Sequence, residues 1–279
     1  MLVILIAILS AGTAGLTGLW SGAYDSLAWL WILPVSFIGT FVVLVLLSLA
    51  FLYLCSMAVD TKKPQEKDSR FYRFLIHLYG DAGMLLLGVR IHATGMEKLP
   101  KDTRFLLVSN HIHDFDPVIL LAKMKKSRLA FISKKENTTK PIVGKVMHKI
   151  LCQLINREND REALKTILKC VEIIQEDKAS IAVFPEGYTS MDGLLHPFRH
   201  GVFKIAQKAK VPIVVCTLQN TNQIVKNGLR LKRTNVQLHL LDVLYPEDIQ
   251  GMTAVQVGTH VHQMMADDLG EDLVLKEMP

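Results

Sequence analysis

The chain has 279 residues, half of them hydrophobic, and a net charge of +6, which is enough sequence for one sizeable domain with an additional segment. Residues 1–59 contain a single charged side chain, Asp25, so residues 60–279 carry all 32 Lys and Arg against 25 acidic residues, a net charge of +7. A basic domain behind an uncharged apolar segment indicates an anionic membrane surface as a partner, and no zinc-finger spacing or aromatic–basic RNA motif indicates nucleic acid. The four cysteines include no CxxC pair and are typical of reduced, buried thiols in a protein that faces the cytosol.

Two apolar runs open the chain. Residues 2–20 carry no charge, and residues 26–59 form an uncharged stretch of 34 residues with Pro34 near the start of its predicted helix. Because a helix needs about 20 residues to cross a bilayer core, we predict a transmembrane hairpin over residues 1–59. A single span with an external N-terminus is the alternative, and a signal peptide over residues 1–20 is disfavoured because no basic residue precedes the apolar run. Basic residues follow the second run and none precedes it, which places the rest of the chain in the cytoplasm.

Residues 60–88 are predicted to connect the hairpin to a domain that spans residues 89–279. Residues 60–69 form a polar linker, and residues 71–88 combine apolar and basic side chains at helical spacing. Such a helix either lies on the bilayer surface or packs against the domain, and the pattern leaves both interpretations open.

Short apolar runs alternate with helical patterns through the rest of the chain. The predicted strands are 89–93, 105–108, 129–133, 152–155, 180–184, 212–218 and 236–244, and the predicted helices are 117–125, 141–151, 160–177, 202–209 and 253–269. This alternation predicts an α/β fold with a largely parallel sheet flanked by helices.

Polar residues follow two of the predicted strands at the point where each strand ends. The stretch Asn110-His111-Ile112-His113-Asp114-Phe115-Asp116 follows the strand 105–108, and Phe184-Pro185-Glu186-Gly187 follows the apolar residues of the strand 180–184. Because ligands bind beyond the carboxyl ends of strands in open α/β sheets, the two stretches predict one site at one edge of the sheet.

The first of these stretches has three interpretations. His111 and Asp116 can form an acid–base pair in which the carboxylate orients the imidazole. Together with His113 and Asp114 they can form a metal site, although Phe115 stands where the corresponding run of metallo-hydrolases has its second acid. Alternatively, the polar residues only satisfy backbone groups in a turn, with Asp116 as the N-cap of the following helix.

The same residues carry a resemblance to a known family. Asn110, His111 and Asp116 resemble the NHxxxxD motif of the glycerolipid acyltransferases, and residues 184–187 resemble their FPEG motif. Weaker blocks at residues 133–136 with 155–157, and at residues 211–215, resemble the other motifs, so that the likeness covers residues 85–220. The sequence is most similar to the 1-acylglycerol-3-phosphate (lysophosphatidate) acyltransferases.

The resemblance implies a role for each motif residue. His111 would deprotonate the lysolipid hydroxyl, which attacks an acyl thioester directly, and Asp116 would orient His111. The implied substrate-binding residues are Asn110, Lys134, Arg157, Glu186 and Gly187. Arg157 and the amides around Gly187 would hold the phosphate, Lys134 the thioester oxyanion, and Glu186 an arginine or a glycerol hydroxyl. The implied partners are a lysophospholipid acceptor, an acyl-CoA or acyl carrier protein donor, and the lipid bilayer, with no metal and no bound cofactor.

One departure from the family pattern concerns the acceptor. Tyr188-Thr189-Ser190 follows the FPEG motif where the family usually has Thr-Arg-Ser, so an arginine that would grip phosphate is missing, and Arg199 and Lys204 are candidates to replace it. We expect a membrane-integral enzyme of phospholipid biosynthesis with a cytoplasmic catalytic domain, which makes phosphatidate. Glycerol 3-phosphate, another lysophospholipid or an aminoacyl lipid remain alternative acceptors. A metal-dependent membrane hydrolase and a non-catalytic membrane-binding protein are the alternatives from other classes.

Overall fold

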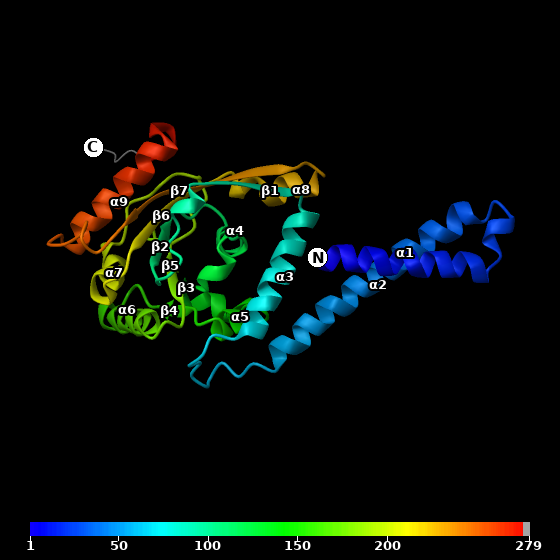
Figure 1. Ribbon diagram of the computed structural model, residues 1–279, viewed down its shortest axis with the longest axis horizontal. Helices are drawn as coiled ribbons and strands as arrows, with labels where there is room; N and C mark the ends of the chain where they lie inside the picture. The colour runs from blue at the N-terminus through cyan, green and yellow to red at the C-terminus, as the bar shows by residue number, and fades with distance from the viewer. Residues whose placement is uncertain (276–279) are drawn as a thin grey trace.

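The computed structural model describes residues 1–275 and consists of an α/β domain from which two long N-terminal helices project (Figure 1). These helices, α1 (Leu2–Trp20) and α2 (Trp29–Met57), form a hairpin in which the hydroxyl of Ser36 donates to Thr17 Oγ1 at 3.1 Å. Both are long and apolar enough to cross a membrane. Pro34 lies inside α2, in the second turn of the helix and thus near its start, as predicted.

Helix α3 (Arg70–Leu86) lies between the hairpin and the domain. The hydroxyl groups of Tyr72 and Tyr79 donate to carbonyl oxygens of α2, those of Cys55 at 2.8 Å and Ser48 at 2.6 Å. On its other side, the buried Arg73 pairs with Asp68 and donates to the carbonyl of Leu129 in the sheet. Helix α3 therefore packs against both α2 and the domain, and its exposed apolar side chains are Phe71, Phe74, Leu85 and Leu86.

A seven-stranded sheet forms the centre of the domain, in the order β1-β7-β6-β2-β5-β3-β4. The strands are β1 (Val89–Thr94), β2 (Leu106–Ser109), β3 (Leu129–Lys134), β4 (Gln153–Ile155), β5 (Ser180–Val183), β6 (Ile213–Gln219) and β7 (Thr234–Leu244). Strands β2 to β6 are mutually parallel, whereas β7 runs antiparallel to β6 and parallel to β1. The prediction of a largely parallel sheet flanked by helices is confirmed.

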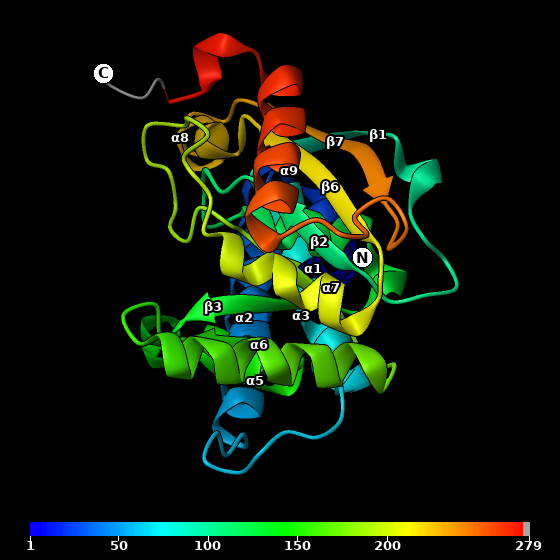
Figure 2. The same ribbon diagram turned by 90° about the vertical axis from the view of Figure 1, so that its left-hand side faces the viewer.

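Helices cover both faces of this sheet. Helices α6 (Asp160–Gln175), α7 (Lys204–Ala209) and α9 (Ala254–Leu269) lie on the face that is turned to the viewer in Figure 2. Helices α3, α4 (Asp116–Lys123) and α8 (Ile224–Leu229) pack on the opposite face, and α5 (Val143–Lys149) contacts α3. Because side chains alternate across a strand, Leu106 and Val108 of β2 enter the hydrophobic core under α6, α7 and α9. Leu107 enters the core on the opposite face, under α3, α4 and α8. Helix α8 was not predicted.

The pairing of β2 with β5 brings the two motif stretches together. These parallel neighbours pair Leu106 with Ile181 and Val108 with Val183, so both strands end at the same edge of the sheet. The residues that follow them, 110–116 and 184–187, therefore meet there.

Candidate active site

Asp116 begins α4, but its carboxylate does not cap that helix. The side chain turns back, and its Oδ2 accepts hydrogen bonds from His111 Nδ1 and from the amides of Ile112 and His113, each at 2.8 Å. Its Oδ1 accepts from the hydroxyl of Thr221 at 2.5 Å. Asp116 is fully buried, so its four donors hold one fixed carboxylate orientation. The interpretation of Asp116 as a helix N-cap is wrong.

His111 presents its other ring nitrogen to a cavity. An ionised carboxylate only accepts hydrogen bonds, which assigns the imidazole proton to Nδ1 and leaves the lone pair of Nε2 free to take a proton. Nε2 lies 3.1 Å from the hydroxyl oxygen of Thr189. The ring stacks on Phe184, with 4.1 Å between ring centroids and 16° between planes. The imidazole is therefore fixed by a carboxylate at one nitrogen and by an aromatic ring on one face.

Glu186 joins the two motif loops to each other. Its buried carboxylate accepts from the amide of His111 at 2.7 Å, from the hydroxyl of Ser190 and from the amide of His196 at 3.2 Å. Burial raises the pKa of Glu186, although these hydrogen bonds oppose the shift. Within residues 1–275, all of its hydrogen bonds go to these loops, so Glu186 positions them. It neither orients an arginine nor lines the cavity, in contrast to the role that the sequence predicts.

Asn110 also faces the protein interior and not the cavity. Its Oδ1 accepts from the amide of Leu218 on β6 at 2.7 Å, and its Nδ2 donates to the carbonyl of the same residue at 2.9 Å. The side chain thus replaces two ladder hydrogen bonds at the point where β2 ends. Asn110 fixes the start of the loop that carries His111, so the structure assigns it a positioning contact instead of the predicted substrate contact.

The cavity beside His111 has a volume of about 620 Å³ and is lined by both apolar and polar side chains. Its apolar wall includes Leu52 of α2, Ile76 of α3, Phe131 of β3, and Val143 and Met147 of α5. Its other lining residues include His111, Lys134, Arg157, Gly187 and Thr189. The exposed side chain of Lys134 comes from the end of β3. Of the seven predicted site residues, the structure places His111, Lys134, Arg157 and Gly187 at this cavity.

Two arginines converge on Gly187. This glycine has a φ of +88°, and a Cβ there would lie 3.1 Å from Arg199 Nε and 3.8 Å from Arg157 Cζ. Burial lowers the pKa of Arg157, and the positive charge of Arg199 lowers it further, whereas Glu136 opposes the shift. Neither arginine belongs to a salt bridge in the described part of the chain. Two guanidinium groups without a salt-bridge partner among the described residues therefore lie close to the backbone of Gly187, an arrangement of charge that suits an anion.

The metal interpretation lacks a set of ligands. Among residues 1–275, no three His, Cys, Asp or Glu side chains are arranged to hold a metal ion. Asp114 points to solvent and lies 3.6 Å from Lys140 Nζ, and the ring of His113 stacks on Phe115 at 5.6 Å. The two additional groups that suggested a metal therefore contact Lys140 and Phe115, and neither is part of a metal-ligand cluster among residues 1–275.

Sequence reasoning missed two contacts of the acid–base pair. Thr221 lies 105 residues after Asp116 and outside the motif blocks, so no local pattern marks it. Thr189 attracts notice only as a departure from the FPEG-Thr-Arg-Ser pattern, yet its hydroxyl contacts His111. Neither of the two proposed substitutes for the missing arginine lines the cavity; the Arg199 side chain lies against Gly187, which does line it, whereas Lys204 begins α7.

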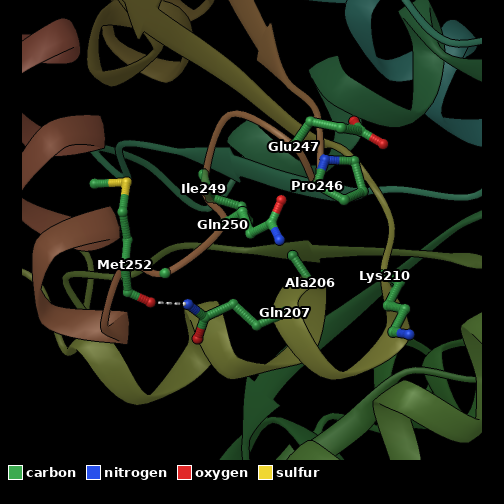
Figure 3. Close-up of a pocket in the computed structure, with 9 residues that line it drawn as sticks. Ala206, Gln207, Lys210, Pro246, Glu247, Ile249, Gln250 and Met252 are labelled. Atoms are coloured by element: carbon green, nitrogen blue, oxygen red, sulfur yellow. Dashed lines mark hydrogen bonds between the residues drawn. The ribbon is translucent and has the colours of Figure 1, made fainter.

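A second cavity of about 350 Å³ lies between α7 and the loop after β7 (Figure 3). Gln207 Nε2 donates to the carbonyl of Met252 at 2.8 Å, and the charged residues Lys210 and Glu247 also line the cavity. None of its lining residues belongs to the motif loops, so this cavity does not take part in the site.

Comparisons with known proteins agree with this arrangement. A family model described as "Acyltransferase" matches residues 90–219. A chloroplastic 1-acyl-sn-glycerol-3-phosphate acyltransferase of Brassica napus is 32% identical over 57% of this chain and 45% of its own length. The enzyme of that name from Borreliella burgdorferi is 31% identical over 57% of this chain and 64% of its own length. The chain thus spans about half to just under two thirds of the length of these curated relatives.

A solved structure has the same fold. The match to the crystal structure of the 1-acyl-sn-glycerophosphate acyltransferase PlsC from Thermotoga maritima covers 82% of this chain and 90% of that chain. The TM-score is 0.61 and the sequence identity is 21%. At that identity the likeness establishes the fold alone.

Proposed function

We propose that this chain, whose residues 90–219 match a family model described as "Acyltransferase", transfers an acyl group from a thioester to the free sn-2 hydroxyl of lysophosphatidate, which gives phosphatidate. The observation that carries this proposal is the position of the His111–Asp116 pair. His111 of this pair lines one cavity together with apolar side chains suited to an acyl chain and with Arg157, which is suited to a phosphate monoester.

His111 is the general base in this proposal. Nε2 removes the proton from the acceptor hydroxyl as its oxygen attacks the acyl carbonyl carbon, and the imidazolium then protonates the departing thiolate. Asp116 stabilises the imidazolium through the 2.8 Å hydrogen bond to Nδ1. Lys134, which lines the same cavity as His111, is the proposed stabiliser of the carbonyl oxyanion.

Arg157 and Arg199 form the proposed phosphate site. The phosphate of lysophosphatidate carries close to two negative charges at neutral pH, and bidentate arginine contacts suit it better than isolated lysines do. Because Gly187 has no side chain, the Arg199 side chain can lie against its backbone, with the Arg157 guanidinium close by. Arg199 thus supplies the charge that the family motif carries two residues after Gly187.

The hairpin supports a membrane-bound enzyme. Helix α2 has 29 residues and a length of about 44 Å at 1.5 Å per residue, more than the roughly 30 Å of a bilayer core. Its C-terminal part lies along α3, and Leu52 in that part lines the cavity. We infer that α1 and α2 insert into the membrane, that the basic domain faces the cytoplasm, and that the lysolipid reaches His111 from the bilayer beside α2.

The replacement of the motif arginine by Thr189 favours a second candidate, acylation of a different acceptor. A panel of acceptors in detergent micelles separates the two, with one acyl-CoA and one acyl carrier protein donor. The main proposal predicts the largest kcat/KM for lysophosphatidate, and a much smaller value for lysophosphatidylcholine, whose phosphate is a diester with one negative charge. Equal or better use of an acceptor without a phosphate monoester would favour the second candidate.

A further inference from the structure

Thr189 forms a hydrogen bond with the basic nitrogen of His111. Nδ1 of the ring donates to Asp116 at 2.8 Å, so the one in-plane lone pair of the neutral imidazole is on Nε2. The Thr189 hydroxyl oxygen lies 3.1 Å from Nε2, and the hydroxyl therefore donates to it. Among residues 1–275, Thr189 is the one residue that hydrogen-bonds to Nε2. The lone pair that a general base needs is thus bonded to the protein itself.

The backbone around this contact is fixed. Ser190 N donates to the carbonyl of His111 at 2.7 Å, and Gly187 N donates to the carbonyl of Phe184 at 3.0 Å. The ring of His111 stacks on that of Phe184, which fixes the plane of the imidazole. The loop therefore holds the Thr189 hydroxyl beside Nε2 at a high effective concentration, and a free molecule must compete with it for the lone pair.

Direct attack by the acceptor needs the same lone pair. In the proposed reaction, the acceptor hydroxyl gives its proton to Nε2 while its oxygen attacks the thioester. One lone pair accepts one well-aligned hydrogen bond, so the acceptor hydroxyl must displace that of Thr189. A lysolipid supplies binding energy for this exchange, from its chain on the apolar wall and from its phosphate at Arg157. Water supplies no such binding energy.

We infer that Thr189 prevents water from using His111 as a base, so that the thioester is transferred and not hydrolysed; this role rests on the proposed acyltransferase function. Without Thr189, His111 would take a proton from water, the water oxygen would attack the carbonyl carbon, the C–S bond would break, and the imidazolium would protonate the thiolate. The products would be a fatty acid and a free thiol. The Thr189 hydroxyl only exchanges its hydrogen-bond partner and forms no bond to the acyl group.

The neighbouring hydroxyl groups cannot take the place of Thr189. The buried hydroxyl of Ser190 donates to the carboxylate of Glu186. The hydroxyl of Thr221 donates to Asp116 at 2.5 Å, on the other side of the imidazole from Nε2. Thr189→Ala therefore leaves Nε2 open to a small donor that enters the cavity, whereas Thr189→Ser retains the hydroxyl.

The test measures the fate of the acyl group. The full-length protein in detergent micelles receives a radiolabelled long-chain acyl-CoA, with and without lysophosphatidate, and free fatty acid and phosphatidate are quantified. The variants are Thr189→Ala, Thr189→Ser and Thr189→Ala combined with His111→Ala, each with thermal unfolding as a control for folding. Thr166→Ala is the matched control, because the Thr166 hydroxyl on α6 donates to the carbonyl of Leu154 at 2.7 Å and Thr166 does not line the cavity.

Thr189→Ala should hydrolyse acyl-CoA about 2- to 12-fold faster than wild type, which corresponds to the net contribution of one hydrogen bond. A larger fraction of the label should also become fatty acid when lysophosphatidate is present. Thr189→Ser and Thr166→Ala should hydrolyse at the wild-type rate, and the double variant at the uncatalysed rate.

Two results would overturn the role of Thr189 alone, provided that wild type makes phosphatidate. One is hydrolysis by Thr189→Ala at or below the wild-type rate. The other is an increase that persists in the double variant, since water would then react without His111. Uncatalysed hydrolysis by every variant, together with no transfer by wild type to any acceptor, would overturn the proposed function as well.

Discussion

Thr221 should affect the kcat/KM of acyl transfer through its contact with the His111–Asp116 pair, although it is not a member of that pair. Its hydroxyl donates to Asp116 Oδ1 at 2.5 Å, and both side chains are fully buried. Thr221→Val keeps the shape of the residue but leaves one oxygen of a buried carboxylate without a donor. A hydrogen bond to a charged group contributes about 1.5–3 kcal/mol. If this free energy is lost from the stabilisation that Asp116 gives to His111 in the transition state, kcat/KM for acyl transfer should fall about 10- to 150-fold.

The assay compares wild type, Thr221→Val and Thr221→Ser in the same micelles, and measures kcat/KM for acyl transfer and thermal unfolding for each. Thr221→Ser restores the donor and should recover most of the activity. A valine variant that unfolds more easily but keeps the wild-type kcat/KM would show that Thr221 only stabilises the fold, and would refute this reasoning.

Three further predictions concern the arginine pair and the loops. Arg199→Ala should raise KM for lysophosphatidate about tenfold or more with little change in kcat, whereas Lys204→Ala should leave both constants unchanged; equal effects of the two would contradict the phosphate assignment. Asn110→Leu leaves the amide and carbonyl of Leu218 unpaired and should lower the free energy of unfolding by about 2–5 kcal/mol, measured by denaturant titration; no loss would contradict the contact. Because folding raises the pKa of Glu186 above 4.5, the folded state binds that proton more tightly, so stability should fall as the pH rises from about 4.5 through the folded-state pKa. Glu186→Gln should lack that fall in thermal unfolding between pH 4 and about 7, and an unchanged pH dependence would contradict it.

The sequence was sufficient for those features that depend on local pattern. Hydrophobic periodicity located the strands that became β2 and β5, and their ends carried the polar stretches that meet at His111 and Phe184. Pattern alone could not reveal that β7 reverses direction beside β6, because apolar alternation is the same in both directions. Helix α8 is only six residues long, too short for a helical period to show.

Side-chain direction was the part of the site that sequence could not supply. Asn110 and Glu186 belong to the motifs, and a motif does not say whether a polar side chain faces a ligand or the backbone of a neighbouring loop. In the structure both face backbone. Thr221 and Arg199 reach the site through tertiary contacts, with Thr221 joining Asp116 across 105 residues of sequence.

The central claim is that His111 is the base of an acyltransferase. The most direct measurement is acyl transfer from a radiolabelled acyl thioester to lysophosphatidate in detergent micelles, with wild type beside His111→Ala and with thermal unfolding as a control for folding. We predict that wild type makes phosphatidate and that a folded His111→Ala variant is slower by about a hundredfold or more. Phosphatidate formation at the wild-type rate by His111→Ala would contradict the account.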